Sequence, residues 1–205
     1  MATASNAWIF SPLVMHFGPG RNRLTDADFF QFCQLNRDWR IERDVRGDLI
    51  IMPPVGGESG QGNSDLNLQL GLWNKRAKSG VVFDSSTGFA LPNGAVRSPD
   101  VAWVLHERWN ALTRAQKQKF PPIAPDFVVE LRSRTDSLRS LRAKMREYID
   151  CGVRLGWLID PLGRRVEIYR PGKKRETLKE PSTLSGEPEL PGFTLDLEPI
   201  WSSWL

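Results

Sequence analysis

The stretch PPIAPDFVVELRSRTD, from Pro121 to Asp136, contains the segment that decides the fold. Its middle part, FVVEL, reads as a buried β-strand in which Glu130 is the only charged residue. Taking a lone carboxylate out of water costs several kcal/mol unless a cation or strong hydrogen-bond donors replace the lost hydration. We therefore expect a compensating partner beside Glu130.

The length and composition of the chain are those of an ordinary globular protein. Its 205 residues suffice for one substantial α/β domain, and its 40% hydrophobic and 25% charged residues indicate neither disorder nor a fibrous structure. We expect an irregular N-terminal arm over residues 1–24, where prolines and glycines interrupt regular structure, and a single domain over residues 25–205.

Cysteine usage and hydropathy bear on the compartment. The two cysteines, Cys33 and Cys151, fit neither a disulfide framework nor a metal site. The N-terminal region lacks the basic segment of a signal peptide, and no stretch approaches the roughly 20 continuous apolar residues of a membrane span. These features predict a cytoplasmic protein that does not associate with membranes.

The net charge of +4 is unevenly distributed along the chain. Residues 131–179 hold 14 Lys and Arg against 6 Asp and Glu, whereas the remainder holds 14 against 18. The basic excess therefore lies entirely downstream of Glu130, which favours contact with a polyanion. A solvated basic surface is the competing interpretation.

Apolar periodicity predicts a mixed α/β fold. Helices are expected over the segments with helical spacing, about 26–35, 59–79 and 137–150, with a weaker helical connection over residues 106–120. Strands are expected over short apolar runs bounded by turn residues: 39–44, 48–55, 80–91, 96–105, 126–132, and the runs that begin at Arg154, Arg164 and Phe193.

A second acidic residue, Asp100, begins another apolar run, SPDVAWV. Facing positions on adjacent strands lie roughly 5 Å apart, so Asp100 and Glu130 could share one hard cation such as Mg²⁺. A metal held in this way can generate hydroxide and stabilise the charge that develops on a phosphodiester. The competing interpretations are an ion pair of Glu130 with Arg132 or another base, and a turn role for Asp100. Asp126 is expected to be structural.

Four segments in order, SPDVAWV, PDFVVELRS, KMREYIDCGVRLGWLIDP and VEIYRPG, resemble the Uma-two family of restriction endonucleases. This family is a branch of the PD-(D/E)XK nuclease superfamily, and the resemblance runs from about Leu49 to Gly172. It implies an α/β fold with a restriction-endonuclease-like core, in which helices flank a central mixed β-sheet. It also implies a magnesium-dependent phosphodiesterase site.

The resemblance assigns roles to particular residues. Asp100 would be the motif aspartate and Glu130 the motif (D/E), both of them metal ligands. Glu58, at the start of the helix expected over 59–79, would be an auxiliary metal-binding glutamate. A simple partner of the helix dipole is the competing interpretation of Glu58.

The motif lysine is where this chain departs from the superfamily. A strict E-x-K pattern requires lysine at the position of Arg132, and an arginine cannot readily serve as a general base. Relatives in the family move the lysine onto the following helix, where Lys144 fits. At about 100° per residue Lys144 falls beside Leu141 and Tyr148, at the border of the apolar stripe. A surface lysine is the competing interpretation.

Arginines on the other flank of the same helix suit a phosphate backbone better than a metal site. We expect contacts to the DNA backbone from three of them, Arg139, Arg142 and Arg146, and from Arg132 at the end of the preceding strand.

Together these features predict a cytoplasmic Mg²⁺-dependent endonuclease that hydrolyses DNA, with Mn²⁺ as a substitute and no organic cofactor. The catalytic set would be Asp100, Glu130, Lys144 and Glu58. A homodimer would supply the two sites that cutting a duplex usually needs. The alternative is a catalytically inactive nuclease-like fold that binds nucleic acid or protein. A third possibility is a nuclease that acts on RNA or branched DNA, which the sequence does not distinguish from an enzyme that acts on DNA duplexes.

Overall fold

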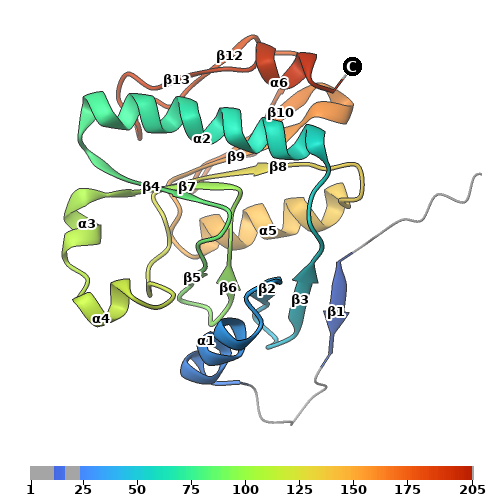
Figure 1. Ribbon diagram of the computed structural model, residues 1–205. Helices are drawn as coiled ribbons and strands as arrows, with labels where there is room; N and C mark the ends of the chain where they lie inside the picture. The colour runs from blue at the N-terminus through green and yellow to red at the C-terminus, as the bar shows by residue number, and fades with distance from the viewer. Residues whose placement is uncertain (1–11, 17–23, 205) are drawn as a thin grey trace, which may run out of the picture.

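A mixed β-sheet of six strands forms the centre of the computed structural model, which describes residues 12–16 and 24–204 (Figure 1). The strands follow one another as β11 (Glu176–Lys179), β10 (Arg165–Tyr169), β9 (Leu155–Asp160), β8 (Phe127–Leu131), β7 (Val101–Leu105) and β4 (Gly80–Asp84). Only the β8–β9 pair in this sheet is parallel. The expected central mixed sheet is confirmed.

Two helices, α2 (Gly57–Ala77) and α5 (Leu138–Asp150), cover opposite faces of this sheet (Figure 1). The odd-numbered residues of β8 pack with the α2 side of the core, while Val128 packs with Met145 and Tyr148 on the α5 side. All five residues of β8 are buried because both faces are covered. Strand alternation places Glu130 on the same face as Val128, the α5 side.

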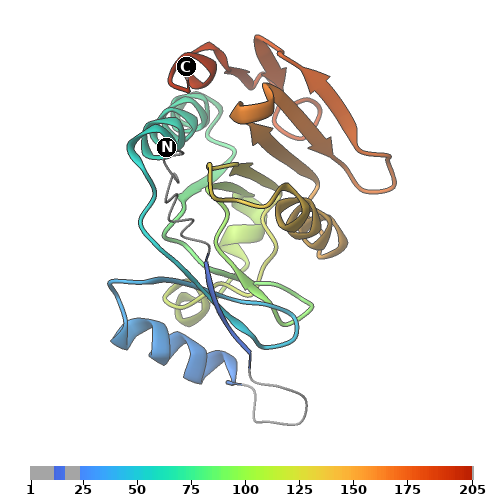
Figure 2. The ribbon, with the colours of Figure 1, turned by 90° about the vertical axis from the view of Figure 1, so that its right-hand side faces the viewer.

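A second, five-stranded sheet lies to one side of the central sheet, at the bottom of Figure 2. Its order is β1 (Leu13–Met15), β3 (Leu49–Met52), β2 (Arg40–Arg43), β6 (Val96–Arg97) and β5 (Phe89–Ala90). Helix α1 (Asp26–Leu35) packs on it through Phe29, which joins Ile41 and Leu49 in a small apolar cluster. This sheet carries charged side chains of β2 and β6 toward the central sheet.

The remaining elements are short. They are α3 (His106–Asn110), α4 (Arg114–Lys117), the 3₁₀ turn η1 (Pro161–Gly163), β12 (Thr183–Ser185), β13 (Thr194–Asp196) and α6 (Glu198–Ser202). The β12–β13 hairpin and α6 lie over α2 (Figure 1). Within the described residues, none of the helices combines the length and apolar character that a membrane crossing requires.

The three strongly periodic helices are confirmed, and the Thr25 side chain caps the first of them by accepting the backbone N–H of Asp28. The expected helical connection over residues 106–120 is instead split into α3 and α4, because Thr113 forms a capping box that starts a new helix. The expectation of an irregular arm is wrong for Leu13–Met15, which pairs with β3. The polar strand β11 was not expected. Residues 1–11 and 17–23 of the expected arm lie outside the described part of the chain.

Two glycines test the packing of α2 against the sheet. A Cβ at Gly80 would lie 2.4 Å from both the Trp103 ring and the Val104 carbonyl oxygen, whereas a Cβ at Gly71 would meet nothing within 4 Å. We expect Gly80→Ala to lower the free energy of unfolding by roughly 1–3 kcal/mol through overpacking. Gly71→Ala should raise it by roughly 0.5–1 kcal/mol, since glycine is a poor residue inside a helix.

Urea unfolding followed by circular dichroism measures both changes. Equal effects of the two substitutions would contradict the placement of Gly80 against Trp103.

Candidate active site

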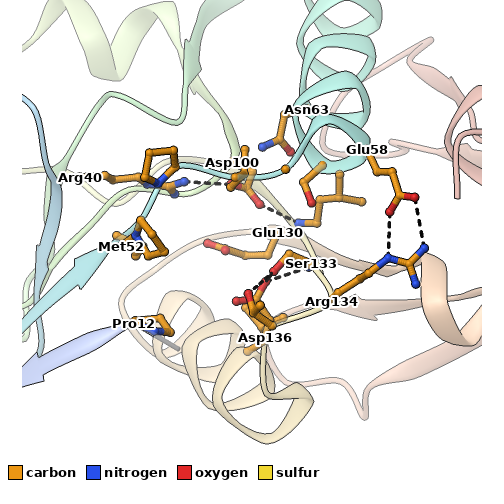
Figure 3. Close-up of a pocket in the computed structure, with 18 of the residues that line it drawn as sticks. Pro12, Arg40, Met52, Glu58, Asn63, Asp100, Glu130, Ser133, Arg134 and Asp136 are labelled. Atoms are coloured by element: carbon orange, nitrogen blue, oxygen red, sulfur yellow. Dashed lines mark hydrogen bonds and ion pairs between the residues drawn. The ribbon is translucent and has the colours of Figure 1, made fainter. Parts of the chain in front are cut away.

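One cavity of about 630 Å³ is lined by all four residues predicted to be catalytic, and Figure 3 shows Asp100, Glu130 and Glu58 among its lining side chains. Asp100, Glu130, Lys144 and Glu58 line it, together with the start of α2 and the loop between β8 and α5. The cavity therefore joins residues that are up to 86 positions apart in the chain.

Strand register sets Asp100 against Glu130. β7 and β8 are antiparallel with Val101 opposite Val129, so Asp100 falls opposite Glu130 one step beyond this pair. The backbone N–H of Leu131 donates to Oδ2 of Asp100 at 2.9 Å, which fixes the carboxylate at the strand end. Both acidic side chains are buried, Asp100 at 7% and Glu130 at 3% exposure. The expected facing of two carboxylates on adjacent strands is thus observed.

The compensating partner of Glu130 is Lys144. The ammonium Nζ lies 2.8 Å from Oε1 of Glu130, and the Tyr148 hydroxyl donates to the same oxygen at 2.9 Å. Helix α5 therefore supplies two groups, Lys144 and Tyr148, that replace water lost by Glu130.

Lys144 has a second carboxylate partner, Glu42 on β2. Its Nζ lies 2.8 Å from Oε1 of Glu42, the same distance as from Glu130. The Lys144 side chain is only 12% exposed, so its ammonium lies in the site and not in bulk solvent. Although burial lowers the pKa of Lys144, Glu130 and Glu42 outweigh it, and the pKa is raised.

The two carboxylates that share Lys144 differ in their surroundings. Burial opposes ionisation of Glu42, but Lys144 and Arg97 outweigh it and lower the pKa of Glu42 to about 2. Burial also disfavours the charge of Glu130, and the neighbouring Asp100 and Glu42 add to this effect. Lys144 compensates only partly, so the pKa of Glu130 is raised to about 7. Glu130 is therefore the carboxylate with the least charge compensation.

Arg40 and Glu42 were not identified from the sequence. Nη1 of Arg40 donates to Oδ1 of Asp100 at 3.2 Å, and its other terminal nitrogen donates to the Ser98 carbonyl. The signal that could have found them is alternation in the short run Arg40–Arg43, because Arg40 and Glu42 share one face and Ile41 occupies the other.

Glu58 lies apart from the other two acids. Its carboxylate accepts two bonds from Arg134, at 2.9 and 3.2 Å, and Figure 3 shows it directed toward Arg134 and away from Glu130. In the described ranges, the Asp, Glu, His and Cys side chains form no cluster of three or more that could hold a metal ion. A cation in this cavity would therefore rely on Asp100 and Glu130.

The arginines predicted to contact phosphate divide into two kinds. Arg132 donates to the fully buried Asp160 at 3.0 Å, and Arg142 makes paired bonds to the fully buried Glu167. A phosphate would have to compete with these internal carboxylates. Arg139 and Arg146 are exposed on α5. Arg132 is not among the residues that line the cavity, whereas Lys144 is.

Asp126 has the structural role expected of it. It accepts the backbone N–H of Leu105 at 2.9 Å and forms an ion pair with Arg108 at 2.9 Å.

Comparisons with known proteins bear on the family and the fold of the chain. The model of the Uma2 family, described as "Putative restriction endonuclease", matches residues 26–198. A crystal structure described as "a putative nuclease belonging to DUF820" from Anabaena variabilis matches with a TM-score of 0.68 and 21% sequence identity. The match covers 80% of this chain and 91% of that chain, which supports the fold. No curated protein matches the chain.

The raised pKa of Glu130 predicts a characteristic pH dependence of stability. The folded protein keeps a proton on Glu130 up to a pKa of about 7, whereas the unfolded chain loses it near 4.5. The stabilisation is complete below pH 4.5 and is lost as the pH rises through 7. Relative to the wild type, Glu130→Gln should therefore gain about 3 kcal/mol of unfolding free energy between pH 5 and 8 in the presence of EDTA.

Chemical denaturation at several pH values measures this difference. Glu167→Gln is the matched control, because the pKa of this buried carboxyl is lowered and it is already ionised at pH 5. Its difference from the wild type should stay nearly constant over the same range. A constant difference for Glu130→Gln as well would contradict the described surroundings of Glu130.

Proposed function

Because the chain belongs to the Uma2 family of restriction-endonuclease-like proteins, we propose that it is a Mg²⁺-dependent endonuclease that hydrolyses DNA in the cytoplasm. One observation carries this proposal. Asp100, just before β7, lies opposite Glu130 of the adjacent strand β8 in a single cavity, and the Lys144 ammonium lies 2.8 Å from Glu130. An acid pair with a nearby lysine is the constellation that phosphodiester hydrolysis in this superfamily requires.

The residues of the cavity fit a hard divalent cation. Mg²⁺ prefers oxygen ligands and usually takes one or two carboxylates, with water and phosphate oxygens completing its octahedron. Asp100 and Glu130 supply such ligands, and the cavity volume of about 630 Å³ leaves room for the others. When bound, the ion would polarise the phosphodiester and lower the pKa of an attacking water.

The side chains of the chain itself would perform three tasks. Lys144 donates hydrogen bonds, so it would orient the attacking water and stabilise negative charge on the phosphate. Arg40, which reaches Asp100 from β2, would offset charge at the same point. Arg134, at the cavity wall and 60% exposed in its side chain, would contact the substrate backbone.

The basic excess of residues 131–179 supports a nucleic acid as the substrate, and exposed Arg139 and Arg146 would add backbone contacts. Two such sites would be needed to cut both strands of a duplex at once, so a homodimer is part of the proposal. A monomer would nick one strand.

The proposal predicts divalent-metal-dependent cleavage of plasmid DNA. Purified protein should nick supercoiled plasmid with Mg²⁺ or Mn²⁺, and Asp100→Asn and Glu130→Gln should each lower the rate by at least about 100-fold, since each removes a charged ligand. Gel electrophoresis of timed samples gives the rates.

Glu167→Gln alters a buried carboxylate on β10, outside the residues that line the cavity. This variant should retain activity within about threefold of the wild type, because a change there affects stability and not the site. Cleavage by Glu130→Gln at the wild-type rate would point to a contaminating nuclease and would rule out this site. Parallel reactions with RNA and with branched DNA identify the substrate.

A specific observation favours the second candidate function, an inactive module that binds nucleic acid or protein. Both acids already have cationic partners, Arg40 on Asp100 and Lys144 on Glu130, and Arg132 occupies the usual place of the motif lysine. Calorimetric titration with Mn²⁺ separates the two functions. The endonuclease predicts binding that Asp100→Asn weakens by at least tenfold, or about 1.4 kcal/mol. The inactive module predicts no heat of Mn²⁺ binding.

A further inference from the structure

The proposed site contains a carboxylate that the metal pair does not include. Glu42 lies on β2 in the five-stranded sheet, yet it contacts Lys144 as closely as Glu130 does, at 2.8 Å. The two contacts give Lys144 one partner on each sheet. Glu42 is 2% exposed, so this contact is shielded from water and from screening by salt.

Glu42 is held rigidly in this position. Its Oε2 accepts a bond from Arg97 at 3.2 Å, and its Oε1 accepts the backbone N–H of Ser98 at 2.9 Å. Arg97 is itself fixed by Glu147 of α5, at 2.6 Å. Because Ser98 precedes Asp100 by two residues, Glu42 is tied both to the segment that carries Asp100 and to the helix that carries Lys144.

A divalent cation on Glu130 would disturb Lys144. The ammonium now shares Glu130 with Tyr148, and an incoming cation would compete for that carboxylate and repel the lysine. A lysine that had only Glu130 as a partner would either block the cation or be driven out of the cavity. The second partner removes this conflict, since Lys144 can rest on Glu42 while Glu130 turns to the cation.

We propose that Glu42 is a positioning residue that retains the Lys144 ammonium beside the site when a divalent cation occupies Asp100 and Glu130. The inference rests on the proposed metal-dependent function and deepens it. Glu42 acts through Lys144 and does not touch the cation or the substrate.

The test is a double-mutant cycle of Mn²⁺ affinity, measured by calorimetry on the full chain. The proteins are the wild type, Glu42→Gln, Lys144→Met and the double variant. Without Glu42, the Lys144 ammonium rests on Glu130 alone and competes with Mn²⁺, so affinity should fall about tenfold. In the Lys144→Met background the competing ammonium is gone, and Glu42→Gln should change affinity less than about threefold.

Equal losses in both backgrounds would overturn the proposal, because Glu42 would then act only through its own charge on the cation. No loss in either background would also overturn it. If the wild type itself does not bind Mn²⁺, the proposed metal site fails and the positioning role fails with it. This last outcome is distinguishable from the first two, which leave the metal site standing.

Two further variants control for misfolding and for the loss of a buried charge elsewhere. Glu42→Asp keeps the charge but withdraws the carboxylate by one methylene, so it should fold and show an intermediate loss of Mn²⁺ affinity. Its affinity decides the matter if Glu42→Gln does not fold, since a wild-type value would overturn the proposal. Glu167→Gln removes the charge of another buried glutamate, which pairs with Arg142 of the same helix, and should leave the affinity within about twofold.

Kinetics provide a second readout that a purely structural role would not move. At saturating Mn²⁺, Glu42→Gln should lower kcat for plasmid nicking with little change in KM. The reason is that a displaced Lys144 ammonium no longer stabilises the transition state, whereas substrate binding is little affected. The double variant should be no slower than Lys144→Met alone. Additive losses in kcat would contradict action through Lys144.

Discussion

The interaction on which the site depends is the sharing of the Lys144 ammonium between Glu130 and Glu42. A carboxylate within a strand that is covered on both faces needs a cation or strong hydrogen-bond donors in place of its lost water. Helix α5 brings that cation to the central sheet, and β2 of the five-stranded sheet holds the cation from the other side. One buried ammonium thereby links two sheets and a helix.

The same arrangement leaves the site prepared for chemistry. Glu130 has a raised pKa because burial and the neighbouring Asp100 outweigh its share of Lys144, whereas Glu42 is held ionised by Lys144 and Arg97. The carboxylate with the least compensation is also the one opposite Asp100. A divalent cation would thus be stabilised between Asp100 and Glu130, where protein cations compensate the negative charge least. This is the physical basis of the proposed function.

Several parts of the site could be predicted from the sequence because their signals are local. Glu130 stands out because it is the charged residue in the apolar run FVVEL, and Asp100 stands out at the start of the apolar run in SPDVAWV. Helical spacing places Lys144 at the edge of the apolar stripe. Other parts depend on contacts between distant segments. Glu42 meets Lys144 across 102 positions and Arg40 meets Asp100 across 60, so no local pattern links either pair. Arg132 and Arg142 were expected at a phosphate backbone, but their buried partners Asp160 and Glu167 come from the later strands β9 and β10.

The central claim is that Asp100 and Glu130 form a metal site beside a lysine that Glu42 retains. Anomalous diffraction from crystals of the protein soaked in Mn²⁺ tests it most directly, because the manganese peak reports position without reference to activity. We expect a peak within ligand distance of both carboxylates, near the roughly 2.0–2.1 Å of the Mg²⁺ that it replaces, with the Lys144 ammonium still bonded to Glu42. A peak at Glu58 alone, or no peak beside Glu130 at Mn²⁺ concentrations that saturate the protein in solution, would contradict it.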